Sequence, residues 1–165
     1  MKAPAAILAH REPTVIAAFV AHWDVTEAEA DALFEDLMAW LWLLAQPDGP
    51  RLVLVAPMRV IDEMWHEAVL DTPRYAALCA QHLGRFVHHV PTGADPIGDA
   101  LPHDREAQLR YIAAQLGVDR VLRWYVELPL RHDDAWFRTA RRTIEHGYTP
   151  PPKLVEAWRA RRGAT

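Results

Sequence analysis

The segment from Thr26 to Gln46 constrains the fold more than any other part of this chain, because it predicts a helix that is apolar on most of its faces. Thr26 and Glu29 have the spacing of a capping box, which marks the start of a helix. Beyond them leucines recur at helical spacing, and aromatic residues and a methionine cover the other faces (Leu33, Leu37, Leu41, Leu44, Phe34, Met38, Trp40 and Trp42). A helix of this composition is buried, so we expect it at the centre of the protein.

Proline, glycine and capping residues divide the rest of the chain into further helices. Residues 52–55 could form a short strand, but no second convincing strand exists to pair with them, so they favour an extended or helical connector, and the composition of residues 91–102 predicts a loop. The sequence predicts an all-α fold, a single-domain bundle of about six to eight helices over residues 1–165. The expected helices besides the central one are 13–23, 57–70, 72–84, 109–116, a short helix through Val126 that Pro129 breaks, 134–146 and a last one carrying Leu154 and Trp158.

Length and composition indicate a single globular domain and argue against several other classes of protein. The 165 residues fit one domain, and 51% hydrophobic residues are enough for a core. The net charge of -4 gives no general attraction for nucleic acid, which argues against a nucleic-acid partner, and we find no nucleotide-cofactor motif. The single cysteine excludes an intramolecular disulfide, and the longest apolar run, nine residues, is far shorter than the ~20 of a membrane span. We expect a cytoplasmic protein without membrane contact.

The charge is unevenly distributed along the chain. Residues 138–165 carry +5, so the remainder carries -9. The expected C-terminal helices, about 134–163, are therefore basic. They could contact an anionic or acidic protein partner, or form a solvated face that packs on the acidic body. The arginines concerned are Arg138, Arg141, Arg142, Arg159, Arg161 and Arg162.

Side chains that bind metals and move protons concentrate in the motif core at about residues 57–91. On a helix over 58–70, the apolar residues from Ile61 to Ala68 form one stripe toward the core. Asp62 and His66 are neighbours at i and i+4 on the edge of that stripe, whereas Glu63 and Glu67 point toward water. A carboxylate and an imidazole then share a half-buried rim, where a metal site or a proton-transfer pair would lie.

The next expected helix and the segment after it add further candidates. Tyr75, Leu78, Cys79 and His82 recur at helical spacing, so Cys79 faces inward. After the turn at Gly84, the adjacent His88 and His89 point to opposite sides of an extended chain, so only one of them reaches a shared site. For the other histidines we expect surface roles (His10, His22, His103, His132 and His146).

These residues resemble a signature of the glycine-rich-domain-containing-protein-like family, which includes bacterial proteins and plant proteins with longer tails. The signature covers about 30 residues and runs Asp62-x-x-Trp65-His66, then Asp71-Thr72-x-x-Tyr75-x-x-x-Cys79, then Gly84-x-Phe86-x-His88-His89-x-Pro91. The family often has a second histidine two positions after the first, where this chain has Ala68. The resemblance implies a shared site rather than a defined reaction.

One functional hypothesis is a metal-dependent enzyme or metal-binding protein that acts on a small molecule or peptide. His66 and His89 would be metal ligands, with His88 as the alternative to His89, and Asp62 would be a ligand or would orient His66. Fe(II) in such a site would imply oxygenase chemistry, and Zn(II) would imply hydrolysis. Asp62, Tyr75 and Cys79 are the candidate catalytic residues.

The other hypothesis belongs to a different class of protein. The same motif would be a structural lock, a set of hydrogen bonds inside a helical interaction module whose binding surface is the basic C-terminal region. Cys79 would then be a buried apolar filler, Tyr75 a core residue with a tethered hydroxyl, and Asp71 a helix cap. The lock would join Asp62, Trp65, His66, Tyr75 and His89.

Overall fold

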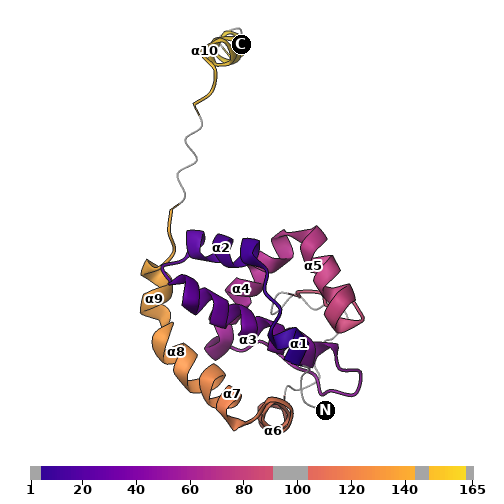
Figure 1. Cartoon of the computed structure of the whole chain (residues 1–165). Coiled ribbons are helices and arrows are strands. Elements are labelled where there is room, and N and C mark those ends of the chain that lie inside the picture. The colour runs from indigo at the N-terminus through magenta and orange to yellow at the C-terminus, as the bar shows by residue number, and fades with distance from the viewer. Residues whose placement is uncertain (1–4, 91–103, 144–148, 163–165) are drawn as a thin grey trace.

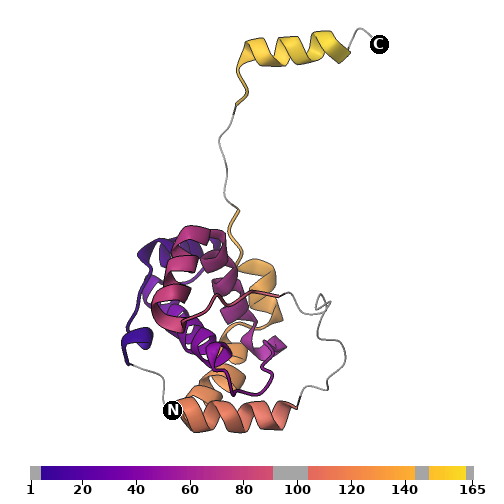
Figure 2. The ribbon, with the colours of Figure 1, turned by 90° about the vertical axis from the view of Figure 1, so that its right-hand side faces the viewer.

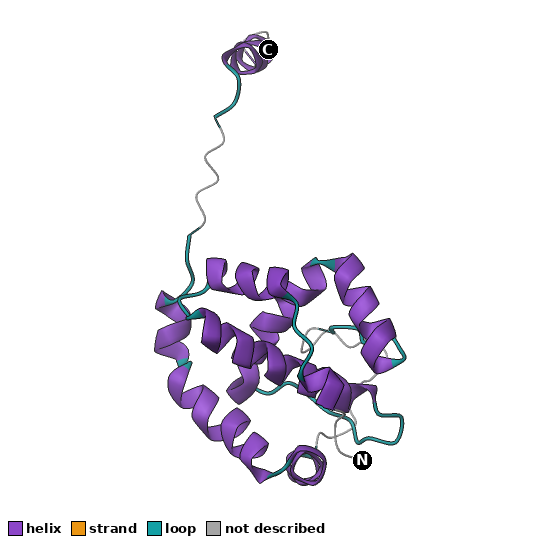
Figure 3. Cartoon of the chain, in the orientation of Figure 1, coloured by secondary structure: helices purple, strands orange, loops and turns teal. Residues whose placement is uncertain are grey.

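The computed structural model describes residues 5–90, 104–143 and 149–162, and these ranges contain helices joined by loops (Figure 3). This confirms the predicted all-α fold. The expected loop at 91–102, together with Pro91, His103 and His146, lies outside the described residues.

Helix α3, Glu27–Ala45, is the central helix of the body (Figure 1). The Glu29 N–H donates to Thr26 Oγ1 over 3.2 Å, which confirms the predicted helix start. Around α3 pack α1 (Ala5–Leu8), α2 (Pro13–His22), α4 (Arg59–Leu70) and α6 (Arg105–Leu116). Twelve of its residues are buried. The helix carries apolar residues on most of its faces because neighbouring helices cover those faces.

A short 3-10 helix, η1 (Ala56–Met58), leads into α4, and α5 (Thr72–Leu78) follows after a bend. The N-cap of α5 is Asp71, because the Asp71 carboxylate accepts the Arg74 N–H. A π-helical turn, η2 (Cys79–Leu83), extends α5 until Gly84 ends it at a φ of 70°. This left-handed conformation is one that glycine adopts without a steric penalty.

Pro129 does not break a helix, contrary to expectation. Helix α7 (Val118–Leu122) continues through a π-helical turn, η3 (Arg123–Glu127), directly into α8 (Leu128–Arg131). In the wide turn the Leu128 N–H bonds to the carbonyl of Arg123, five residues back. The widened register just before Pro129 accommodates a ring that would clash in a regular helix.

Helix α9 spans Asp134–Thr139 and is shorter than the predicted helix 134–146. Its N-cap is Asp133, whose carboxylate accepts the Trp136 N–H over 2.8 Å. After Ala140 the chain leaves the helix and pairs with the end of α2. The Asp24 N–H donates to Ala140 O, and the Arg142 N–H donates to His22 O, each over 2.8 Å. These tertiary bonds replace the helical ones.

The basic region divides into two parts. Near the body, Arg142 pairs with Asp24 at 2.8 Å, and the Arg141 guanidinium lies over the Trp23 ring. Helix α10 (Pro152–Arg162) carries Arg159, Arg161 and Arg162 and lies apart from the other helices (Figures 1 and 2). It buries no residue. Within the described ranges, no helix is long and apolar enough to cross a membrane.

Candidate metal centre

Three predicted residues converge at the edge of the body. The metal-binding atoms of Asp62, His66 and His89 all lie within 4.8 Å of one another. His89 Nε2 is 2.8 Å from Asp62 Oδ1, and the rings of His66 and His89 have centroids 4.5 Å apart. The expected convergence of these imidazoles and this carboxylate is therefore confirmed as geometry.

Helix α4 positions two members of this cluster through its buried stripe. Ile61, Met64, Trp65 and Ala68 are buried, as predicted. Asp62 and His66 consequently lie at the rim, with side chains that are 32% and 49% exposed. Open access combined with a fixed backbone suits a site that must exchange ligands with solvent.

The expectation that Glu67 faces water is wrong. Its side chain is largely buried, and Oε1 lies 2.7 Å from His22 Nδ1 of helix α2. Helix α2 covers that side of α4, which a helical wheel drawn on α4 alone cannot show. Glu63 remains near the cluster, with Oε2 3.7 Å from His66 Nδ1.

A hydrogen-bonded lock that is smaller than the hypothesis expected, made of Trp65, Tyr75 and Val87, holds the segment that carries His89, the third member of the cluster. Trp65 Nε1 donates to the Tyr75 hydroxyl over 3.0 Å, and that hydroxyl donates to Val87 O over 2.6 Å. Burial raises the pKa of Tyr75, with the Cys79 thiol adding to the effect and the Trp65 hydrogen bond opposing it. The Tyr75 hydroxyl therefore stays protonated, and the lock ties residue 87 to α4 and α5.

The alternation of the extended segment decides which histidine joins the cluster. Val87 is buried, His88 is exposed, and His89 turns back toward α4. The His89 ring meets the Trp65 ring edge-on, with centroids 4.5 Å apart. His88 instead lies against Phe86, at 4.8 Å between centroids, and is outside the cluster.

Tyr75 and Cys79, the other candidate catalytic residues, lie in the lock and the core rather than in the cluster. Both are buried, and the Tyr75 hydroxyl already uses one acceptor and one donor position. A direct part in catalysis for these two residues stays a prediction. The structure gives Tyr75 a positioning part, because its hydroxyl fixes the chain two residues before His89, and it places Cys79 in the core.

A cleft of about 240 Å³ opens beside the cluster. Asp62 belongs to both, so a molecule in the cleft would reach the cluster directly. The connector before η1 forms one wall and the first turn of α4 forms the other. The cleft is lined by Leu54, Val55, Ala56, Arg59 and Asp62.

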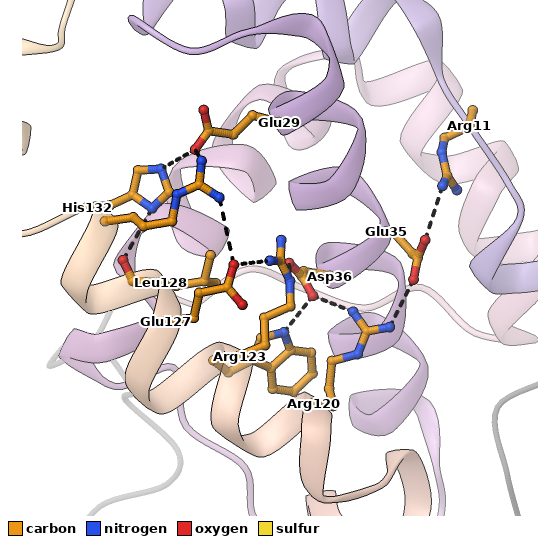
Figure 4. A network of polar contacts seen from close by, with 11 residues as sticks. Arg11, Glu29, Glu35, Asp36, Arg120, Arg123, Glu127, Leu128 and His132 are labelled. Carbon is orange, nitrogen blue, oxygen red and sulfur yellow. Dashed lines mark hydrogen bonds and ion pairs between the residues drawn. The ribbon is translucent and has the colours of Figure 1, made fainter.

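Sequence reasoning missed a second polar centre, which lies inside the body around Asp36 (Figure 4). Asp36 is fully buried, and its carboxylate accepts hydrogen bonds from Arg120, from Arg123 and from Trp124 Nε1. Burial raises the pKa of Asp36, and the two guanidinium groups work against that rise. The signal was present in the sequence, since an acid inside an apolar helix requires buried partners.

The polar network extends on both sides of Asp36, and it corrects the expected surface role of His132. Glu35 joins Arg120 to Arg11 through hydrogen bonds of 2.9 and 3.2 Å. His132 is buried, with Nε2 3.1 Å from a carboxylate oxygen of Glu29 and Nδ1 3.2 Å from Leu128 O. Burial lowers the pKa of His132, while Glu29 opposes that change.

Comparison with known families adds one finding. The family described as UCP032817-like matches residues 11–111, which is more than half of the chain. The chain belongs to the UCP032817-like family. The match runs from α2 into the first part of α6 and thus includes the whole cluster and lock. No curated protein and no solved structure matches the chain.

Proposed function

We propose that this protein is a mononuclear metalloprotein whose ligands are Asp62, His66 and His89. The observation that carries the proposal is the convergence of two imidazoles and one carboxylate, from two separate segments, within 4.8 Å. Two histidines and one carboxylate form a ligand set typical of Fe(II) and Zn(II) sites that keep open positions.

The donor set fits a single ion after a small adjustment. Bonds of about 2.0–2.2 Å to one metal place neighbouring donors about 3 Å apart. His89 Nε2 and Asp62 Oδ1 already meet this separation at 2.8 Å. The half-exposed His66 would have to move inward, and its exposed side chain has room to rotate.

Surrounding residues support the orientation that binding requires. Metal-binding histidines usually donate their second ring N–H to a carboxylate or carbonyl, which fixes the ring. Glu63 lies 3.7 Å from His66 Nδ1 and is placed to take that part. The Trp65–Tyr75–Val87 lock holds His89 from behind, so one ligand is rigid and another is adjustable.

The arrangement supports chemistry on a small molecule or the end of a peptide. When bound, Zn(II) would supply an activated water for hydrolysis, and Fe(II) would supply oxygen chemistry. The protein's own part is to hold three donors, leave solvent-facing positions open and admit a ligand through the cleft beside Asp62.

Elemental analysis and titration of metal-stripped protein with Zn(II) or Fe(II) test the proposal. We expect one ion per chain in the wild type. His66→Ala and His89→Ala should each lose most of the bound metal, because the ligands act as a unit. His88→Ala is the matched control, since this neighbour of His89 lies outside the cluster. Metal uptake that is equal in His88→Ala and His89→Ala would contradict the proposal.

A second candidate function is supported by helix α10. Leu154 and Trp158 are exposed apolar residues one turn apart on a helix that also carries Lys153, Arg159, Arg161 and Arg162. The remainder of the chain carries the compensating negative charge, and α10 buries nothing on it. We propose that α10 binds an acidic protein surface through its arginines, with Trp158 as an apolar anchor.

Binding to polyglutamate tests this second function at two salt concentrations. The wild type should bind, and more weakly at high salt. A variant with Arg159, Arg161 and Arg162 changed to Gln should not bind, whereas Arg110→Gln on α6 should behave like the wild type. Binding to single-stranded RNA but not to polyglutamate would overturn the choice of partner.

We also propose a relationship to the glycine-rich-domain-containing-protein-like family. Its support is that the signature residues meet in space, with Trp65 and Tyr75 in the lock and Asp62, His66 and His89 in the cluster. Ala68, which replaces the family's second histidine, is buried toward the core. A structure of a member with no equivalent Trp–Tyr hydrogen bond would contradict this relationship.

A further inference from the structure

Arg59 gives the cleft beside the cluster a positive side chain. It precedes Asp62 by three residues on α4, so the two residues are neighbours on the helix surface. Its guanidinium carbon lies 3.9 Å from the centre of the Phe137 ring, which fixes its plane. Its Nε forms an ion pair with Glu63 Oε1, one turn farther along α4, at 3.9 Å, a separation too long for a hydrogen bond. Among the described residues the Arg59 guanidinium has no hydrogen-bond acceptor, so its N–H groups are available to a ligand.

The opposite wall of the cleft is rigid. It belongs to the extended connector that precedes η1, and a buried glutamine holds this connector from the side. The Val53 N–H donates to Gln108 Oε1 over 2.9 Å, and Gln108 Nε2 donates to Val53 O over 3.0 Å. Leu54, Val55 and Ala56 follow directly and line the cleft. A preformed wall lowers the ordering cost of binding.

The geometry points to a small carboxylate-bearing molecule as the ligand of this cleft, with its carboxylate on Arg59 and its other end at the metal. This inference rests on the proposed function, because a divalent ion outweighs the negative charge of Asp62 and makes the cleft attract anions. A planar guanidinium pairs with a carboxylate through two parallel hydrogen bonds. The volume of about 240 Å³ lies below the ~300–1,000 Å³ of sites for drug-sized ligands.

The spacing along α4 sets the length of the expected ligand. Three residues rise about 4.5 Å along a helix, so the α-carbons of Arg59 and Asp62 are separated by roughly that distance along the axis. A molecule with about two carbons between its metal-binding group and its carboxylate therefore spans the two positions.

Two hydroxamates that differ only in their tails test the inference on zinc-loaded protein. Acetohydroxamate binds a metal through its hydroxamate group and has no charge on its tail. Succinic monohydroxamate adds a carboxylate after two methylene groups. Isothermal titration should give about tenfold tighter binding of the succinic compound to the wild type, because the Arg59 pair is charge-assisted but half-exposed.

Arg59→Met should remove this tenfold advantage, so that the variant binds the two hydroxamates with similar affinities. Arg59→Lys should keep part of the advantage, because it retains the charge without the planar fork. Arg110→Met on α6 should keep all of it. The ratio of the two affinities within each variant controls for differences in folding or metal content.

Two outcomes overturn the inference and can be told apart. Equal affinities for the two hydroxamates in the wild type, or an advantage that survives Arg59→Met, would reject the carboxylate ligand and leave the metal site intact. Failure of the wild type to take up zinc would reject the proposed metal site, and the inference would fall with it.

Discussion

The centre around Asp36 and the cluster around Asp62 use the same kinds of polar side chain but differ in how completely these are satisfied. Asp36 is fully buried, and two arginines and a tryptophan N–H surround its carboxylate. Asp62 is one-third exposed and has His89 as its hydrogen-bond partner at a rim beside a cleft.

The difference separates polar groups that maintain the fold from polar groups that are free to react. A buried network in which every polar group has a partner has no free donor or acceptor for a ligand. Loss of one member leaves the other groups buried without a partner, which destabilises the fold. A rim cluster with spare donor positions costs little to keep and can exchange its partners. The two regions should therefore respond in opposite ways to mutation and to metal.

The largest expected effect is that of Asp36→Ala. It leaves the guanidinium groups of Arg120 and Arg123 and the indole N–H of Trp124 without their shared acceptor, so the free energy of unfolding should fall by about 3–5 kcal/mol. Urea unfolding measures this loss. The control is Asp31→Ala, whose part-buried pair with Arg11 at the surface should contribute at most about 1 kcal/mol. Similar losses in both variants would remove the distinction drawn here.

Tyr75→Phe should have the next largest effect and should connect stability with binding. Loss of the hydroxyl leaves Trp65 Nε1 and Val87 O unpaired in the core, which should lower stability by about 1–3 kcal/mol. Because the lock holds His89, metal affinity should fall as well, by roughly 10-fold or more. Urea unfolding and metal titration measure the two changes. A destabilised variant with unchanged metal affinity would mean that the lock does not position the site.

Sequence reasoning succeeded where local periodicity decides the outcome. The burial of Ile61, Met64 and Trp65 follows from helical spacing alone, and so do the rim positions of Asp62 and His66. The alternation of His88 and His89 follows from extended backbone. The helix end at Gly84 could also be placed from the residue type, because glycine adopts a positive φ without a steric penalty.

Sequence reasoning failed where contacts with a distant segment determine whether a residue is buried or where a helix ends. The burial of Glu67 depends on His22 of α2, and the end of α9 depends on hydrogen bonds from Asp24 and Arg142. Pro129 remains helical because a π-helical turn precedes it. Each of these features needs the tertiary arrangement, which spacing within one helix does not contain.

Acidification should weaken the body through the buried His132. Burial lowers its pKa in the folded state, so its stabilising contribution is complete above the ordinary histidine pKa near 6.5 and is lost as the pH falls toward the lower folded value. His132→Gln should therefore lose less stability than the wild type between pH 7.5 and 5, as followed by urea unfolding. A steeper loss in the variant would show that Glu29 keeps His132 protonated instead.

The smallest expected effect is that of His88→Ala. This side chain is exposed and lies outside both polar regions, so stability should change by no more than about 0.5 kcal/mol. Thermal melting and metal titration should both match the wild type. A clear loss of metal would mean that His88 replaces His89 as the ligand.

The melting temperature of the wild type, with and without added Zn(II), is the most direct test of whether Asp62, His66 and His89 bind a metal ion. A metal that binds only the folded cluster stabilises it by about 2.7 kcal/mol at a hundredfold excess over Kd, or about 5–10 °C for a chain of this size. We expect this rise in the wild type and in Asp31→Ala, its reversal by a chelator, and its absence in His89→Ala. A wild-type melting curve that neither metal nor chelator changes would contradict the proposed metal site.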